Sequence, residues 1–140
     1  MKQPLFSFQY PVRLEDLDYM AIVGNAQWLN FLLRARIDLL DELKFSFSKL
    51  EELKVGAVVA RAEIDYLRPA KFGDCLKITI EPHSFFEKGV FLRNTVQNNR
   101  GEVCLKAELK MVFVNSQGRA THIPEGLRLL LAAQQSSVKQ

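Results

Sequence analysis

The sequence predicts an α+β fold in which one long helix packs against an antiparallel sheet of about five strands. Three observations support this prediction: one long amphipathic helical stretch early in the chain, strict two-residue alternation after it, and short turn sequences between the alternating stretches. One helix followed by several strands is typical of a helical layer on a sheet. With 140 residues, of which 48% are hydrophobic, the chain can build its own core. We therefore expect one domain, residues 1–133, and a disordered tail, residues 134–140.

The N-terminal part is predicted to hold one strand, one acidic turn and the long helix. The strand spans Leu5 to Leu14, where aromatic and β-branched residues alternate with polar ones, and the turn Glu15-Asp16-Leu17-Asp18 follows it. The helix runs from about Ala26 to Lys44, because Asn25 is a favoured N-cap residue. Gly24, just before this cap, would permit an unusual backbone angle.

The rest of the chain is predicted to be mainly strands. After a short amphipathic piece from Ser48 to Lys54, the period changes to two, and Val55 to Tyr66 reads as one long strand with two alternating faces. Three further strands follow, joined by short turns: Leu76 to Glu81, Val90 to Gln97 and Val103 to Val114. Successive hairpins predict an antiparallel meander whose core face lies on the long helix. A terminal helix should follow Pro124 and end near Ala133.

Arg36 is unusual because it falls on the apolar side of the predicted helix. Counted from Trp28 at about 100° per residue, the leucines of the helix occupy an arc from about 20° to 140°, and Arg36 falls near 80°. Burial of a charged group there is unfavourable unless the fold or a ligand supplies a partner. A buried arginine and a nearby aspartate, Asp18, suggest a site.

Composition excludes several classes of protein. The net charge of +3 is too small to indicate nucleic-acid binding, and no apolar run approaches the roughly 18 residues that a membrane span requires. The N-terminus has no signal-peptide core, so we expect a cytoplasmic protein. Cys75 and Cys104 lack a metal-binding spacing, and we expect both thiols to be free and the protein to need no metal.

Three stretches resemble one known family. They are Val12-Arg-Leu-Glu-Asp-Leu-Asp18 with the loop to Trp28, Leu33-Arg-Ala-Arg36, and Ile64-Asp-Tyr-Leu-Arg-Pro-Ala-Lys-Phe-Gly-Asp74. In these stretches the chain resembles the hotdog-fold acyl-CoA thioesterases of the 4-hydroxybenzoyl-CoA thioesterase type, in which a curved antiparallel sheet wraps a central helix. The resemblance covers almost the whole chain. It implies a thioesterase that hydrolyses acyl-CoA or acyl carrier protein thioesters to a free acid and a thiol, without a cofactor.

The resemblance also implies catalytic roles for three residues. Asp18 corresponds to the carboxylate that acts as nucleophile or as general base on water. Backbone N–H groups around Asn25 and Ala26 would polarise the thioester oxygen. Arg36 would orient the Asp18 carboxylate or bind the oxyanion. Each role has a structural alternative: Asp18 shapes a turn, Asn25 only caps the helix, and Arg36 forms an ion pair. The candidate partners for that ion pair are Asp65, Glu63 and Asp16.

Two groups of residues are expected to bind the substrate. Apolar side chains near it would line an acyl pocket, although such residues are more often core; these are Tyr19, Met20, Val23, Trp28 and Phe31. The resemblance implies that basic residues would meet the phosphates of CoA, and the candidates are Arg61, Arg68, Lys71 and Arg100. It also implies a homodimer or homotetramer in which a second copy covers an exposed sheet edge and the sites lie at the interface.

The sequence departs from the family pattern at three positions. Many relatives have a glycine at Ala21, a histidine or second asparagine near Asn25, and a glutamate at Leu33. These departures leave a second function open, a hotdog module that binds acyl thioesters with weak or no hydrolysis. A hotdog dehydratase or hydratase would need a histidine paired with a carboxylate near the helix, and no histidine lies near Asp18.

Overall fold

A computed structural model describes residues 6–134 of the chain. One strand comes first, two helices and four further strands follow, and a last helix ends the described chain. Two short 3₁₀ turns, Leu14–Asp16 and Tyr19–Ala21, lie between the first strand and the first helix. In chain order the elements are β1 (Phe6–Pro11), α1 (Asn25–Glu42), α2 (Phe47–Glu52), β2 (Val55–Tyr66), β3 (Cys75–Phe86), β4 (Gly89–Gln97), β5 (Val103–Asn115) and α3 (Glu125–Ala133).

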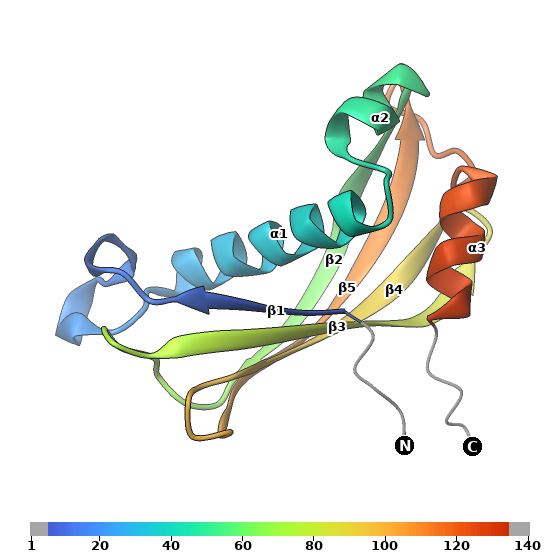
Figure 1. Ribbon diagram of the computed structural model, residues 1–140. Coiled ribbons are helices and arrows are strands. Elements are labelled where there is room, and N and C mark those ends of the chain that lie inside the picture. The colour runs from blue at the N-terminus through green and yellow to red at the C-terminus, as the bar shows by residue number, and fades with distance from the viewer. Residues whose placement is uncertain (1–5, 135–140) are drawn as a thin grey trace.

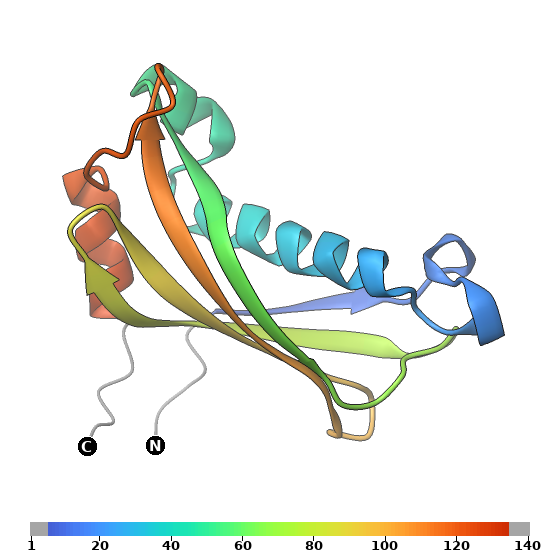
Figure 2. The same ribbon diagram turned by 180° about the vertical axis from the view of Figure 1, so that it is seen from behind.

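The described strands form one antiparallel sheet in the order β1-β3-β4-β5-β2. The predicted meander is correct for β3, β4 and β5. However, β2 is not a hairpin partner of β3, because it crosses to the opposite edge and pairs with β5. The sheet bends around α1, which lies in its concave side, and α3 packs near the outer ends of β3 and β4 (Figures 1 and 2). The predicted α+β fold of a helix wrapped by a five-stranded sheet is confirmed.

The core fills the space between α1 and the concave face of the sheet. Phe31, Leu32 and Ala35 of α1 are buried, as are alternate residues of the three central strands. Those strand residues are Leu76, Ile78, Ile80, Val90, Leu92, Val96, Leu105, Ala107, Leu109, Met111 and Phe113. Their alternation is the period-two pattern expected for a sheet that has one packed face.

The edge strand β2 is mostly exposed, unlike the central strands. Its register with β5 shifts between Val59 and Arg61, so Ala60 is an extra residue in a β-bulge. The predicted alternation is therefore interrupted at this point, and the adjacent Val58 and Val59 are 45% and 41% exposed. An edge strand that exposes neighbouring valines on both faces offers an apolar, unpaired surface.

Other differences from the prediction concern the ends of elements. α1 ends at Glu42 rather than near Lys44, because Lys44 adopts a left-handed φ of 66°. β1 ends at Pro11, and β3 extends to Phe86. Apart from Gln134, the predicted tail lies outside the described residues. No helix within residues 6–134 is long and apolar enough to cross a membrane.

Candidate active site

The loop between β1 and α1 is held in a tight and strained conformation. Met20 and Ala21 have positive φ angles of 68° and 58°, which are uncommon for residues other than glycine. Two backbone hydrogen bonds enclose these residues: the Asp18 N–H donates to Ile22 O at 2.9 Å, and the Ala21 N–H donates to Asp18 O at 3.1 Å. Val23 N–H then donates to Ala70 O at 2.8 Å, which fixes the loop to the segment after β2.

Asp16 anchors this loop from the inside. Only 1% of the residue is exposed, and its Oδ2 accepts a hydrogen bond from the Arg13 backbone N–H at 2.9 Å. Its Oδ1 lies 3.8 Å from a guanidinium nitrogen of Arg34 on α1. Asp16 was expected in an acidic turn and as a candidate ion-pair partner of Arg36, but its partner is Arg34, and its anchoring role was not predicted. Asp16 is buried, whereas Asp18, two residues later, is exposed.

The Asp18 carboxylate lies directly over Gly24, at the start of α1. A Cβ atom added to Gly24 would be 2.3 Å from Asp18 Oδ2 and 2.9 Å from its Cγ. Gly24 has φ −72° and ψ 154°, so the predicted unusual backbone angle is wrong. Glycine is needed here because any side chain would displace the carboxylate. Among residues 6–134, the Asp18 carboxylate has no hydrogen bond or ion pair, which leaves its oxygens available to a ligand.

The first residues of α1 present free backbone donors beside this carboxylate. Gly24 is the N-cap residue and Asn25 is already helical, so the predicted capping role of the Asn25 side chain is wrong. Gln27 and Trp28 donate their N–H groups to Gly24 O at 2.9 and 3.2 Å. The N–H groups of Asn25 and Ala26 have no acceptor among the described residues, and both residues are exposed. They are unpaired donors at the positive end of the helix dipole.

An open hollow of about 480 Å³ brings most of the predicted site residues together. Its lining includes Asp18 and Asn25 together with Tyr19, Val23 and Trp28, all three of which were expected to line an acyl pocket. Tyr19 is 83% exposed, whereas Val23 and Trp28 are buried and form part of the core as well. Of the other two apolar candidates, Met20 lines the hollow and Phe31 does not.

Three of the four basic candidates gather at a second hollow that adjoins the first. Arg68, Lys71 and Arg100 line it, and Arg68 also lines the hollow at Asp18. Arg61 is elsewhere, on β2, where its guanidinium forms an exposed ion pair with Glu63 at 2.7 Å. Within residues 6–134, no three His, Cys, Asp or Glu side chains gather in a way that could hold a metal ion.

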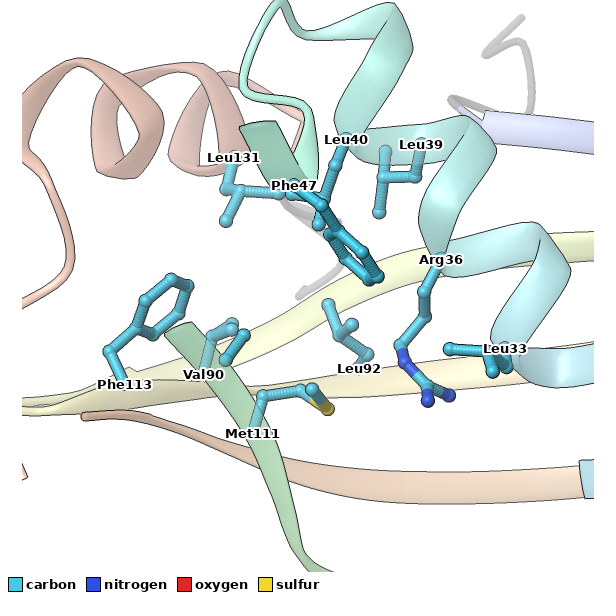
Figure 3. Close-up of a pocket in the computed structure, with 11 residues that line it drawn as sticks. Leu33, Arg36, Leu39, Leu40, Phe47, Val90, Leu92, Met111, Phe113 and Leu131 are labelled. Atoms are coloured by element: carbon cyan, nitrogen blue, oxygen red, sulfur yellow. The ribbon is translucent and has the colours of Figure 1, made fainter. Parts of the chain in front are cut away.

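Arg36 is not near Asp18 within the chain. It lines a separate groove between α1, β2 and the central strands, and its position is eleven residues, or roughly 16 Å, beyond Asn25 along the helix (Figure 3). None of the ion pairs expected as alternatives is present: Asp16 faces Arg34, Glu63 faces Arg61, and Arg36 contacts no carboxylate among the described residues. Burial lowers the pKa of the Arg36 guanidinium from its ordinary value.

Known proteins with related sequences and structures were compared with this chain. The thioesterase-like superfamily matches residues 12–131. An acyl-CoA thioester hydrolase, YbgC, from Escherichia coli is 30% identical over 110 residues, which cover 77% of this chain and 82% of the relative. The long-chain acyl-CoA thioesterase FadM from the same species is 30% identical over 119 residues, which cover 84% and 89%.

The fold is also found among solved structures. A Staphylococcus aureus protein solved in complex with CoA superposes with a TM-score of 0.87 at 18% identity, and the match covers 96% of this chain and 88% of that one. The predictions of a hotdog fold and of a thioesterase are confirmed by these matches. The chain belongs to the thioesterase-like superfamily.

Proposed function

We propose that this protein hydrolyses acyl-CoA thioesters at the hollow beside Asp18. The observation that carries the proposal is the position of the Asp18 carboxylate over Gly24, next to the free N–H groups of Asn25 and Ala26. A thioester carbonyl at the start of α1 would have donors for its oxygen and a carboxylate beside its carbon. The relatives YbgC and FadM, which are named acyl-CoA thioesterases, support this substrate class.

Two reaction routes are consistent with this arrangement. In the first, an Asp18 oxygen attacks the carbonyl carbon, the C–S bond breaks, and the CoA thiolate takes up a proton; water then hydrolyses the mixed anhydride. In the second, Asp18 accepts a proton from water, the resulting hydroxide attacks the same carbon, and the thiolate leaves. In both routes the Asn25 and Ala26 N–H groups stabilise the negative charge that develops on the thioester oxygen.

The CoA moiety would extend from Asp18 toward the second hollow, which Arg68, Lys71 and Arg100 line. Arg68 lines both hollows, and Lys71 and Arg100 line the second, so phosphate groups on this path would meet the cationic side chains of Arg68 and Lys71. Arg100 is paired with Glu102 at 3.2 Å and would have to exchange this partner for a phosphate. The structural likeness to a protein solved with CoA supports CoA rather than a carrier protein as the thiol. Arg61 is not on this path, and we do not assign it to phosphate binding.

We also propose that the protein works as a homodimer paired through β2. Within residues 6–134 this edge strand has no partner on its outer side, and it exposes Val58, Val59 and Tyr66. A second copy paired along β2 would cover these residues. Light scattering should give twice the mass of the chain. Val58→Lys should reduce the mass to that of one chain, whereas an unchanged mass would contradict pairing through β2.

Product analysis with a substrate panel tests the proposed activity. Acyl-CoAs of increasing chain length and an aromatic acyl-CoA are incubated with the enzyme, and free CoA is quantified by chromatography. We expect turnover well above the uncatalysed rate with an optimum in acyl length. No turnover with any acyl-CoA would contradict the proposal. A single turnover in ¹⁸O-labelled water separates the routes, because the acid would carry an unlabelled Asp18 oxygen only if Asp18 is the nucleophile.

A further inference from the structure

Arg36 lies on the same side of α1 as Asn25, about three turns further along the helix. At about 100° per residue, Asn25, Leu29 and Arg36 fall within about 40° of one another around the helix axis. Leu29 and Leu33 lie between the two ends and are 48% and 37% exposed, although both were expected to face the core. An exposed apolar stripe therefore leads along α1 from the proposed thioester site to a cationic side chain.

The groove at the far end of this stripe is apolar apart from Arg36. Figure 3 shows its guanidinium among aliphatic, aromatic and thioether side chains, and it points back toward Leu33. The other lining residues are Leu33, Leu39, Leu40, Phe47, Ala57, Val90, Leu92, Met111, Phe113 and Leu131. The free space of about 60 Å³ accommodates roughly four or five atoms, which suits the end of a chain.

No group within the described chain neutralises Arg36. The helix neighbours one turn away on its side, Leu33 and Leu40, are apolar. The nearest acidic residue in sequence, Asp38, accepts a hydrogen bond from the Tyr10 hydroxyl instead. Arginine stays charged in proteins, and its planar donors match a carboxylate in bidentate geometry. A guanidinium in an apolar, partly desolvated groove is therefore a strong site for an organic anion.

We propose that Arg36 binds a carboxylate at the far end of the acyl group, so that the preferred substrates are CoA monothioesters of linear dicarboxylic acids. This inference rests on the proposed function, which places the thioester at Asp18 and the start of α1. Asn25 and Arg36 are roughly 16 Å apart along the helix, and the Arg36 guanidinium points back toward Asn25 by about one turn. The path between them is therefore roughly 12 to 16 Å. At about 1.25 Å per bond in an extended chain, this length corresponds to acyl groups of roughly ten to fourteen carbon atoms.

Binding of two thioether analogues of CoA tests the proposal without requiring turnover. The analogues are S-dodecyl-CoA and S-(11-carboxyundecyl)-CoA, and titration calorimetry gives the Kd of each. We expect the Kd of the carboxylated analogue to be at least tenfold lower than the Kd of S-dodecyl-CoA in the wild type. Arg36→Met should reverse this order, Arg36→Lys should retain part of the preference, and Arg119→Met, an exposed control, should change neither Kd. Equal affinities in the wild type would overturn the proposal.

Hydrolysis of dodecanedioyl-CoA and dodecanoyl-CoA separates a failure of this inference from a failure of the proposed function. If neither thioester is hydrolysed, the proposed function fails, and the calorimetric preference still decides the role of Arg36. If both are hydrolysed, Arg36→Met should raise KM for the dicarboxylic substrate at least tenfold more than it raises KM for dodecanoyl-CoA. An equal loss of kcat for both substrates would overturn the inference and return Arg36 to the chemical step. Dissociation of a dimer by Arg36→Met would also overturn it, because the partner of Arg36 would then be the second copy.

Discussion

Replacement of Gly24 by alanine tests whether the position of the Asp18 carboxylate controls catalysis. The new Cβ atom would be 2.3 Å from Asp18 Oδ2, so the carboxylate must move by about 1 Å to reach an ordinary contact distance. A misplacement of this size costs roughly a hundredfold in rate. The backbone itself suits alanine, because φ is −72° at Gly24. We therefore expect kcat for the best acyl-CoA to fall by about a hundredfold while the melting temperature stays the same or rises slightly.

Two comparisons make this experiment specific. Gly56→Ala is the matched control, since no atom lies within 4 Å of the Cβ that it adds on β2, and it should leave kcat unchanged. Gly24→Ala combined with Asp18→Asn should be hardly slower than Asp18→Asn alone, because both changes act through one carboxylate. Wild-type kcat in folded Gly24→Ala would refute the idea that Asp18 must occupy this position.

Three further results are expected. Asp16→Ala should lower the free energy of unfolding by about 2 kcal/mol in urea titrations, because the Arg13 backbone N–H loses its charged acceptor. A change below about 0.5 kcal/mol would contradict the anchoring role. Burial and the hydrogen bond to Asp38 raise the pKa of Tyr10, so the stability that this hydroxyl contributes is present below about pH 10 and is lost as the pH rises further. The difference in unfolding free energy between wild type and Tyr10→Phe should therefore shrink between pH 9 and pH 11, and a constant difference would exclude the linkage. Native protein should react with a thiol reagent at Cys75 and not at Cys104, which is buried and whose pKa is raised by that burial, and fast labelling of both would contradict the described packing.

The sequence predicted elements where periodicity alone decides the structure. The strand Val55 to Tyr66 was placed correctly at both ends, because the change of period at Val55 is clear and the alternating stretch is long. Its position in the sheet was not predictable, since short connections favour pairing of successive strands, whereas β2 crosses to pair with β5. The bulge at Ala60 has no marker in the residue pattern either, because alanine fits both faces of a strand.

The candidate site was also predicted only in part. The resemblance brought Asp18, Asn25 and Trp28 to one place, as the structure does. The general freedom of glycine gave the wrong reason for Gly24, because glycine serves close approach as well as unusual backbone angles and only coordinates distinguish the two. Helical periodicity placed Arg36 on the apolar side of the helix correctly. It does not show which residues of other elements pack around Arg36, because those residues are distant in sequence.

The most direct test of the proposed mechanism is the kcat of Asp18→Asn, measured together with its affinity for a thioether analogue of CoA. Asp41→Asn makes the same chemical change at an exposed position near the other end of α1 and serves as the control. We expect Asp18→Asn to lower kcat by roughly a hundredfold or more, as the loss of a general base or nucleophile does, with an unchanged Kd for the analogue and a wild-type kcat in Asp41→Asn. Wild-type kcat in Asp18→Asn would contradict the assignment of Asp18 to the chemical step.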